Sequence, residues 1–412
     1  MPTWEFACGD TLASDAFNSN TTRFNALAGA LRGYISAESD VQTKVFSSYT
    51  WANLYFRVTI KTYTGNPTLR SRVNAANGAL LVTITGTGVF EDTVNTDSLV
   101  NGDLIDFSVT TPNEVGQTMS ATVLGSTLEN TSTNDTLAVV SGGSGSAPSV
   151  NFGLTRFALI GGEIGIGGAL ATTESDVQYT IRRATTFTNV RVIIRTNTIN
   201  TGTTVWRFRV NAANVNQLVN IAAGATGAFE DTTNSDPVVA GDEVNQQVVT
   251  SGASGAISTQ LAQLAHSSTG REVMSASVSP DSWTTDLYFG AEADAAGTAT
   301  ESSSQIAARA AFTAEDLFVN VTAHGASNGV NFYLRQNGAN SALTLNVAAS
   351  STGLFEDTTN SVSIAATDTY NYLLDHGGGA GSITPTIIGM AQGPTDVIAD
   401  LPRIGLNILL RM

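Results

Sequence analysis

One seven-residue pattern, Thr-Gly-x-Phe-Glu-Asp-Thr, occurs three times in this chain of 412 residues. The copies span residues 87–93, 226–232 and 352–358, so the period is about 130 residues. Solenoid repeats have periods of roughly 20–50 residues and share one continuous core. The longer period here instead predicts three whole domains, each with a hydrophobic core of its own.

Further anchors occur in the same order in each copy. An aspartate follows each repeated phenylalanine at a fixed distance, and an arginine upstream precedes an Asn-containing segment. A Glu-Ser-Asp-Val-Gln segment lies further upstream and is degraded in the third copy. The anchors are Glu38–Gln42, Arg72–Asn77, Phe90 and Asp103, then Glu174–Gln178, Arg209–Asn214, Phe229 and Asp242, then Glu301–Gln305, Arg335–Asn340, Phe355 and Asp368. Several anchors in a fixed order exclude chance similarity.

The boundaries between the domains are expected where the composition changes. Residues 141–148 read Ser-Gly-Gly-Ser-Gly-Ser-Ala-Pro, which is the composition of a flexible linker. A second boundary is expected near Ser279–Asp281. The repeats are therefore expected at residues 1–148, 149–280 and 281–412.

Apolar residues alternate with polar ones within each copy, as at Ile105, Phe107 and Val109. Alternation over short runs between turns is typical of antiparallel strands that are buried on one face. Charged residues make up only 13% of the chain, and this favours strands over helices. Asn77-Gly78 is interpreted as a hairpin turn, since both residues tolerate positive φ. We expect an all-β fold of three tandem jelly-roll-like β-sandwich domains.

Composition also excludes several classes of function. The net charge is −16 and the basic residues are scattered, which argues against nucleic-acid binding. Cys8 is the single cysteine, so no intrachain disulfide or multi-cysteine metal site can form. Residues 1–10 do not resemble a signal peptide. The longest apolar stretch, residues 152–171, is interrupted by Arg156, Glu163 and several glycines, so it is not expected to span a membrane. We expect a protein that is made in the cytoplasm, without a signal peptide, and that does not bind a membrane.

The repeated Glu-Asp pair permits two interpretations. Its oxygen atoms and those of nearby residues could bind Ca²⁺, or the segment could be a turn in which the phenylalanine packs inward and polar side chains satisfy loop N–H groups. We favour the turn, in which Glu230 contributes little to stability. Adjacent strand residues point to opposite faces, which excludes an acid–base pair. The three sets are Glu91, Asp92, Asn95 and Asp97, then Glu230, Asp231, Asn234 and Asp236, then Glu356, Asp357 and Asn360.

The histidines and tryptophans occupy different places in the three copies. The histidines are expected on the surface rather than at a metal. The tryptophans are expected in cores or between domains, with stacking on sugars as the alternative. These residues are His266, His324, His376, Trp4, Trp51, Trp206 and Trp283. No catalytic residue, metal ligand or cofactor-binding residue is expected, and the chain is expected not to be an enzyme.

The segment Thr226–Asp242 carries a resemblance to a known family. Its Phe-Glu-Asp-Thr and Ala-Gly-Asp parts resemble the Phe-x-Asp-Thr … Ala-Gly-Asp segment of jelly-roll domains in bacteriophage virion proteins, which are similar in outline to the C1q/TNF-like sandwich. The resemblance covers all three copies, and Thr367 replaces the glycine in the third. It implies structural or adhesive parts of a particle, often trimeric, and no catalytic residues.

On this basis we expect a non-enzymatic structural protein of the virion, either a capsid decoration (cement) protein or an accessory tail protein. Its expected partners are the major capsid protein or tail components. The alternative is a tail or spike protein that binds glycans on the host surface. The three domains are expected to close into an intrachain pseudo-trimer, with a linear array as the alternative.

Overall fold

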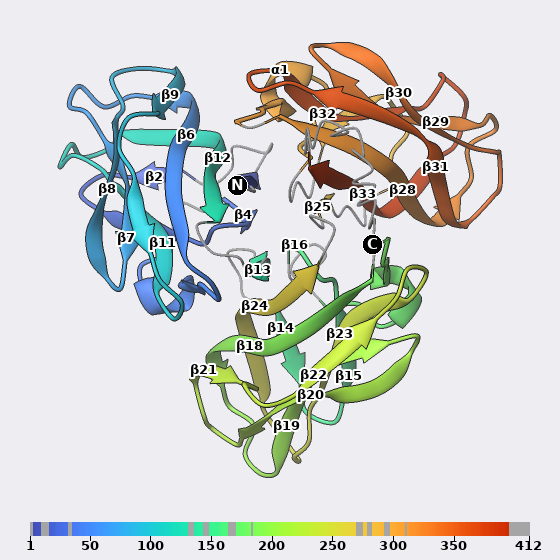
Figure 1. Cartoon of the computed structure of the whole chain (residues 1–412), viewed down its shortest axis with the longest axis horizontal. Helices are drawn as coiled ribbons and strands as arrows, with labels where there is room; N and C mark the ends of the chain where they lie inside the picture. Colours follow the sequence, from blue (N-terminus) through green and yellow to red (C-terminus); the bar gives the residue numbers. More distant parts are fainter. Residues whose placement is uncertain are drawn as a thin grey trace, which may run out of the picture.

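Apolar alternation arranges the described part of the chain into six β-sheets, two for each copy of the repeat. The computed structural model describes residues 3–9, 16–31, 35–130, 136–142, 148–163, 170–182, 184–268, 275–277, 282–291, 297–309 and 311–394. We name the three copies unit 1 (β1–β12), unit 2 (β13–β24) and unit 3 (β25–β33). In each unit an inner sheet, nearer the centre of the molecule, packs against an outer sheet (Figure 1). The expected all-β fold of three tandem jelly-roll-like sandwiches is confirmed.

Unit 1 sets the pattern of strands. Its inner sheet has the order β10-β6-β12-β1-β4, with β2 and β9 paired at its sides, and its outer sheet has the order β3-β11-β7-β8, with β5 paired to β11. The strands are β1 (Thr3–Gly9), β2 (Phe17–Asn18), β3 (Thr22–Asn25), β4 (Gly29–Ala30), β5 (Thr43–Lys44), β6 (Tyr49–Lys61), β7 (Thr68–Val73), β8 (Ala76–Thr83), β9 (Gly88–Asp92), β10 (Asp97–Leu99), β11 (Leu104–Thr110) and β12 (Thr118–Asn130).

Unit 2 repeats this arrangement. Its inner sheet has the order β16-β13-β24-β18-β21, with β14 and β22 at its sides, and its outer sheet has the order β15-β23-β19-β20, with β17 paired to β23. The strands are β13 (Thr136–Gly142), β14 (Ser149–Asn151), β15 (Thr155–Ala158), β16 (Gly162–Glu163), β17 (Tyr179–Thr180), β18 (Thr185–Asn197), β19 (Thr203–Val210), β20 (Ala213–Ala222), β21 (Gly227–Glu230), β22 (Ser235–Val238), β23 (Glu243–Val249) and β24 (Ala256–Ser268).

Unit 3 has the same two layers with fewer described strands. Its inner sheet has the order β25-β33-β28-β31, and its outer sheet has the order β26-β32-β29-β30, with β27 paired to β32. The strands are β25 (Ser275–Ser277), β26 (Leu287–Phe289), β27 (Ile306–Ala307), β28 (Phe312–His324), β29 (Val330–Gln336), β30 (Ala339–Val347), β31 (Gly353–Ile364), β32 (Thr369–Asp375) and β33 (Ile383–Pro394). The continuous β31 covers the places that two short strands occupy in the other units.

The helical segments in the described ranges are single turns. They are η1 (Glu38–Asp40), η2 (Glu174–Val177) and α1 (Glu301–Ser304), and each begins at the glutamate of the upstream anchor. No helix within the described ranges has the length and apolar character that crossing a membrane requires.

Two of the tryptophans fill the cores. Trp51 is fully buried between the two sheets of unit 1, and Trp206 is fully buried between the two sheets of unit 2. The indole N–H of Trp51 donates to Ser126 Oγ at 2.8 Å, and that of Trp206 donates to Gln246 Oε1 at 2.6 Å. A buried indole needs such a partner, so these contacts fix both rings in place. The expected core role of these tryptophans is confirmed.

The expected hairpin turn at Asn77-Gly78 is wrong. Both residues lie within β8, and the turn is Asn74-Ala75, whose φ angles are +51° and +61°. The guanidinium of Arg72 holds this turn, because it donates to Ala75 O and Asn77 Oδ1 as well as to Glu38. Gly78 is required by the close packing around it, because a Cβ there would lie 2.3 Å from Ser71 Oγ.

The expected domain boundaries differ from the pairing of the strands. β13 pairs with β24 and therefore belongs to the inner sheet of unit 2, although it precedes residue 148. In the same way β25 pairs with β33 in unit 3, although it precedes residue 281. Each unit thus has a first strand that completes its inner sheet. Of the expected linker at residues 141–148, the first two residues belong to β13, and residues 143–147 lie outside the described residues.

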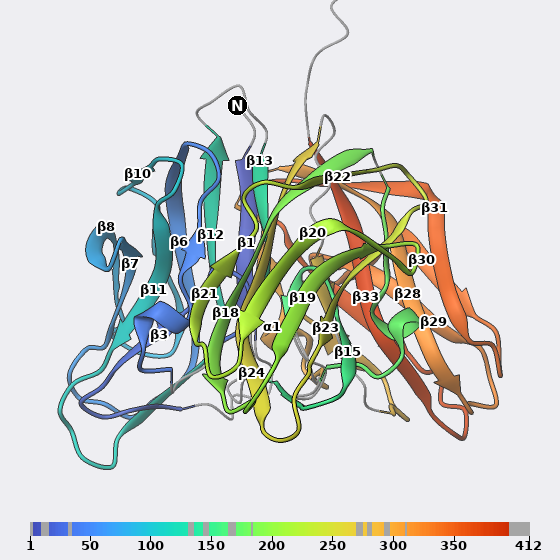
Figure 2. The same ribbon diagram turned by 90° about the horizontal axis from the view of Figure 1, so that it is seen from below.

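The three units stand around a common centre. Figure 1 shows three lobes whose inner sheets face this centre. Figure 2, turned by 90°, shows the units side by side at one level, with their long strands running along the central axis. This is the closed arrangement of a pseudo-trimer rather than a linear array.

Candidate functional site

The aspartate of the repeated Glu-Asp pair caps the turn that follows it. Asp92 Oδ1 accepts hydrogen bonds from the N–H groups of Val94 and Asn95, at 3.1 and 3.0 Å. Its Oδ2 accepts from Leu81 N–H and Asn95 Nδ2, at 2.8 and 2.9 Å. Asp231 and Asp357 repeat this pattern. The turn interpretation is confirmed.

These hydrogen bonds also set the charge of the turns. Burial alone raises the pKa of a carboxyl group. In all three turns the loop donors outweigh burial and lower the pKa, to about 2 for Asp231. The three aspartates are therefore ionised in the folded chain and are already engaged with loop donors.

Of the residues of the calcium hypothesis, Asp92 and Asn95 are brought together by hydrogen bonds, but Glu91 and Asp97 do not join them. Glu91 and Asp92 are neighbours on β9 and point to opposite faces. Asp97 accepts from Ser71 Oγ at 2.5 Å and from Ala79 N–H at 2.6 Å. Within the described ranges, no group of three or more His, Cys, Asp or Glu side chains could hold a metal ion.

The glutamate of the same pair points out of its own unit and binds a cation of the preceding one. Lys44 of unit 1 binds Glu230 of unit 2 at 2.8 Å, and Arg182 of unit 2 binds Glu356 of unit 3 at 2.7 Å. Arg309 of unit 3 returns to Glu91 of unit 1 at 2.9 Å. We name these the first, second and third interfaces. The cyclic order is that of a head-to-tail contact that closes after three steps.

Apolar contacts follow the same cyclic order. Val123, Leu261 and Ile387 are equivalent, because they pair with Arg57, Ile193 and Asn320 at the same register of the inner sheets. Val123 joins the core of unit 3, and Ile387 joins that of unit 2. Leu261 and Ile193 pack against unit 1 in a cluster with Ala26, Ile35 and Val41. Each interface therefore has an apolar centre beside its ion pair.

Aromatic rings complete the second and third interfaces. The Arg182 guanidinium lies 5.3 Å from the ring centre of Phe318, and that of Arg309 lies 4.2 Å from the ring centre of Tyr55. Tyr55 and Phe318 are equivalent, because each pairs with the repeated glutamate of its own unit. Such contacts are worth about 0.5–2 kcal/mol, depending on burial.

At the first interface the cation and the aromatic residue exchange positions. Phe46 stands eight residues after the anchor glutamate, where Arg182 and Arg309 stand in the other units. Arg191 pairs with Glu230 and so stands where Tyr55 and Phe318 stand. One cation and one aromatic residue are retained with their sides reversed. The ring of Phe46 lies 5.7 Å from Nζ of Lys44 in its own unit.

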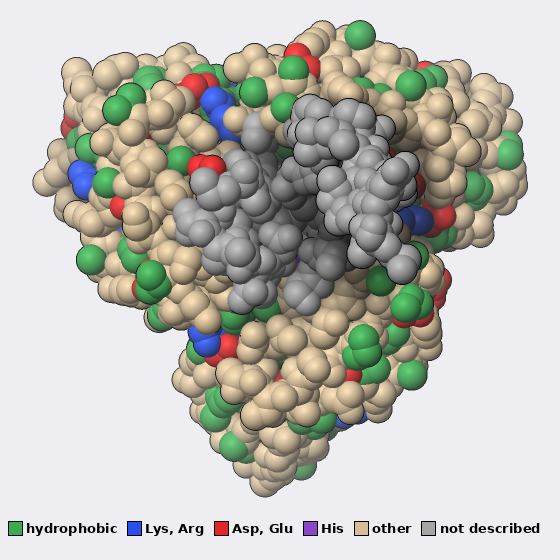
Figure 3. Space-filling model, in the orientation of Figure 1, with side chains coloured by type: hydrophobic (Ala, Val, Ile, Leu, Met, Phe, Trp, Pro, Cys, Tyr) green, Lys and Arg blue, Asp and Glu red, His purple; other side chains and the backbone are tan. Residues whose placement is uncertain are grey.

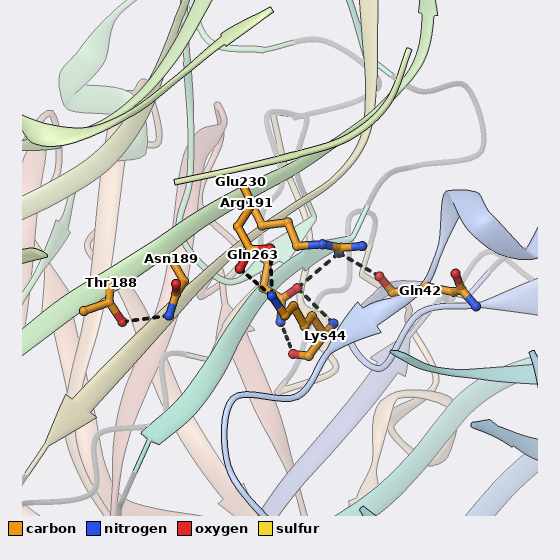
Figure 4. Close-up of polar contacts among 7 residues, drawn as sticks. All are labelled: Gln42, Lys44, Thr188, Asn189, Arg191, Glu230 and Gln263. Carbon is orange, nitrogen blue, oxygen red and sulfur yellow. Dashed lines mark hydrogen bonds and ion pairs between the residues drawn. The ribbon is translucent and has the colours of Figure 1, made fainter. Parts of the chain in front are cut away.

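Figure 4 shows the polar contacts of the first interface. Gln263 of unit 2 binds the main chain of Lys44 as a neighbouring strand would: Oε1 accepts from the N–H at 3.1 Å, and Nε2 donates to the carbonyl at 2.5 Å. Arg191 donates to Gln42 O at 2.9 Å. Burial lowers the pKa of Arg191, and the negative charge of Glu230 opposes this. The interface therefore buries a positive charge that depends on Glu230.

Sequence reasoning assigned little importance to Glu230 and missed these interfaces. The signal was present, because Arg182 and Arg309 lie at the same distance after the second and third anchor glutamates. Lys44 stands two residues earlier than that position. Lys44 is the last residue of β5, and Arg182 and Arg309 lie two residues after the ends of β17 and β27. A cation close to the end of this short strand is thus common to all three units.

The expected surface position of the histidines is wrong, since all three are buried. His266 is 1% exposed, lies on β24 beside the ring of Phe187, and has a pKa lowered to about 4 by burial. His376 is 0% exposed, and its main-chain N–H donates to Asp286 Oδ1 at 2.9 Å. The remaining tryptophans are Trp283, which packs against the core of unit 3, and Trp4, whose side chain lies outside the described residues.

The face of the molecule in Figure 3 carries few charged side chains. On the face in Figure 3 most atoms belong to uncharged polar residues and backbone, and basic and acidic side chains lie next to each other where the lobes meet. Several of the charged side chains on this face thus lie at the interfaces.

Comparisons with known proteins identify no family for this chain. No protein-family model matches the chain, and no curated protein matches it. One solved chain, described as "The Triple Jelly Roll Fold and Turret Assembly in an Archaeal Virus", is 12% identical, and the match covers 94% of this chain and 95% of that one. Its TM-score is 0.19, which is too low to bear on fold or function.

Proposed function

We propose that this protein is a non-enzymatic structural component of a virus particle. The observation that carries the proposal is the cyclic set of interfaces, which closes three jelly-roll units of one chain around a single axis. Jelly rolls are common in virus shells, where threefold positions are abundant. A single chain with this shape occupies a threefold position without needing to assemble from three subunits.

Within that role, we propose a capsid decoration (cement) protein or an accessory tail protein of a bacteriophage. The resemblance of Thr226–Asp242 to jelly-roll domains of phage virion proteins supports this choice. The proposed partners are the major capsid protein or tail components, and the proposed location is the virion. The alternative role in binding host glycans loses its main support, because Trp51 and Trp206 are buried in cores.

Quantitative mass spectrometry of purified particles tests the proposal. We expect this chain as a stoichiometric component of particles from which loosely bound protein has been washed away. A copy number comparable to the number of threefold positions supports cement, and a few copies per particle support the tail. Abundance in the infected-cell lysate together with absence from washed particles contradicts a structural role in the virion.

A further inference from the structure

A cleft of about 330 Å³ opens at the second interface, between units 2 and 3. Its lining includes two carboxylates of unit 2, Asp176 and Glu243, and faces Thr322 of unit 3. Leu354 of unit 3, which is 40% exposed, supplies apolar surface. The cleft thus combines negative charge with an apolar wall, as sites for cationic side chains do.

The equivalent place at the first interface holds an arginine. Asp40 corresponds to Asp176 in the anchor segment, and Arg195 corresponds to Thr322, since both stand two residues after the equivalent Ile193 and Asn320. Arg195 Nε lies 3.7 Å from Asp40 Oδ2. At the first interface the aspartate of unit 1 therefore has a guanidinium of unit 2 as its partner.

The second interface keeps the aspartate but not the arginine. Thr322 is too short to cross the cleft, and Glu243 adds a carboxylate where unit 1 has Leu104. The third interface has lost both members, because Ser303 and Thr59 stand at these places. Of the three interfaces, the second alone retains the acid without the arginine.

The electrostatics of the two aspartates follow from this difference. Burial raises the pKa of Asp40, and the positive charge of Arg195 opposes the rise. Burial also raises the pKa of Asp176, where the opposing contribution is a hydrogen bond with Thr173 rather than a cation. A cation that enters the cleft would meet a partly desolvated carboxylate.

We propose that this cleft binds the guanidinium group of an arginine side chain presented by another protein. A guanidinium is planar and donates two parallel hydrogen bonds to a carboxylate, whereas an ammonium is a point charge. Asp176 takes the place that Asp40 has toward Arg195, Glu243 adds a second acceptor, and Leu354 contacts the methylene groups. The inference concerns this cleft alone and does not require the virion role.

Methyl NMR of the full chain tests the proposal, with N-acetyl-arginine methylamide as the probe. We expect saturable shifts at the methyl groups of Leu354, with a Kd in the millimolar range. Ala228, which is equivalent to Leu354 at the first interface, is the internal control and should not shift. The isosteric but uncharged citrulline derivative and the lysine derivative should each bind at least roughly tenfold more weakly.

Three variants make the test specific. Asp176→Asn should weaken binding of the arginine probe at least roughly tenfold, whereas the matched variant Asp40→Asn should leave it unchanged. Thr322→Arg supplies the guanidinium from within the chain and should abolish binding, and its methyl spectrum reports whether it is folded. Binding that survives Asp176→Asn, equal binding of the citrulline or lysine derivative, or no shift at Leu354 overturns the proposal.

Discussion

At the residue scale, the three units act as controls for one another. Asp106 on β11 pairs with Arg72 at the place where Asn245 and Asn371 pair with the equivalent arginines. Asp106 is fully buried, and both of its carboxyl oxygens are without a hydrogen-bond donor among the described residues. Burial, together with the negative charge of Glu38, raises its pKa to about 9, and Arg72 opposes this only in part. At neutral pH Asp106 is therefore protonated and uncharged, as asparagine is.

Replacing Asp106 with asparagine should stabilise the protein. Below pH ~4 the folded and unfolded chains both carry the proton, and the aspartate costs nothing. As the pH rises toward about 9, the unfolded chain loses its proton and the folded chain keeps it, so the free energy of unfolding falls by ~1.4 kcal/mol per pH unit. Asp106→Asn should remove this slope and raise stability by ~2–4 kcal/mol at neutral pH. Urea unfolding across this pH range measures both effects.

The reciprocal change is the control. Asn245 is buried at the equivalent place and donates to Glu174 O. Asn245→Asp should destabilise unit 2 and introduce the pH dependence that Asp106→Asn removes from unit 1. If Asp106→Asn destabilises the chain at neutral pH, then Asp106 is ionised in the folded state.

Residue-scale expectations succeeded where the cause was local. Asp92, Asp231 and Asp357 satisfy N–H groups two and three residues away, and turn chemistry alone predicts this. The depth of a side chain is set by distant strands, so it was not predictable. Phe229 is half-buried at the edge of its core rather than fully buried, and the cost of Phe229→Ala is correspondingly below the ~3–5 kcal/mol of a full core position.

At the scale of elements, the two faces of one short strand make different contacts: one face packs on its own unit, and the other contacts another unit. In the Phe-Glu-Asp segment the phenylalanine and the aspartate contact their own unit, and the glutamate between them faces the preceding unit. Alternation over a few residues predicted the strand. The partner of the glutamate was not predictable in this way, since Lys44 and Glu230 are 186 residues apart in the chain.

A double-mutant cycle on Lys44→Met and Glu230→Gln tests the ion pair of the first interface. The pair is partly buried, with side chains 24% and 18% exposed, so we expect a coupling of about 1–2 kcal/mol. Glu230→Gln alone should cost more than Lys44→Met alone, because it also removes the negative charge beside the buried Arg191. Denaturant unfolding at low and high salt measures both, and the coupling should weaken with salt. A coupling near zero at low salt, or equal costs of the two single changes, contradicts this account.

At the scale of the whole molecule, the third interface separates a ring from a linear array. A linear array of three units makes the first and second interfaces, but only a closed ring brings unit 3 back to unit 1. Here Tyr55 and Val123 of unit 1 belong to the core cluster of unit 3, and Arg309 binds Glu91. The internal repeat predicted three similar units, but closure depends on contacts between the two ends of the chain, and no local pattern encodes them.

Small-angle scattering of the isolated chain tests closure. A compact body of 412 residues has a radius of gyration of about 22 Å. Val123→Asp places a charge in the third interface and should increase this radius, because burying an unpaired carboxylate costs more than the contact gains. Val94→Asp is the matched control, since Val94 is 86% exposed and its change should leave the radius as it is. A native chain with a clearly larger radius and a rod-like profile contradicts closure. An unchanged radius in a folded Val123→Asp variant shows that the first and second interfaces hold the three units together without the third.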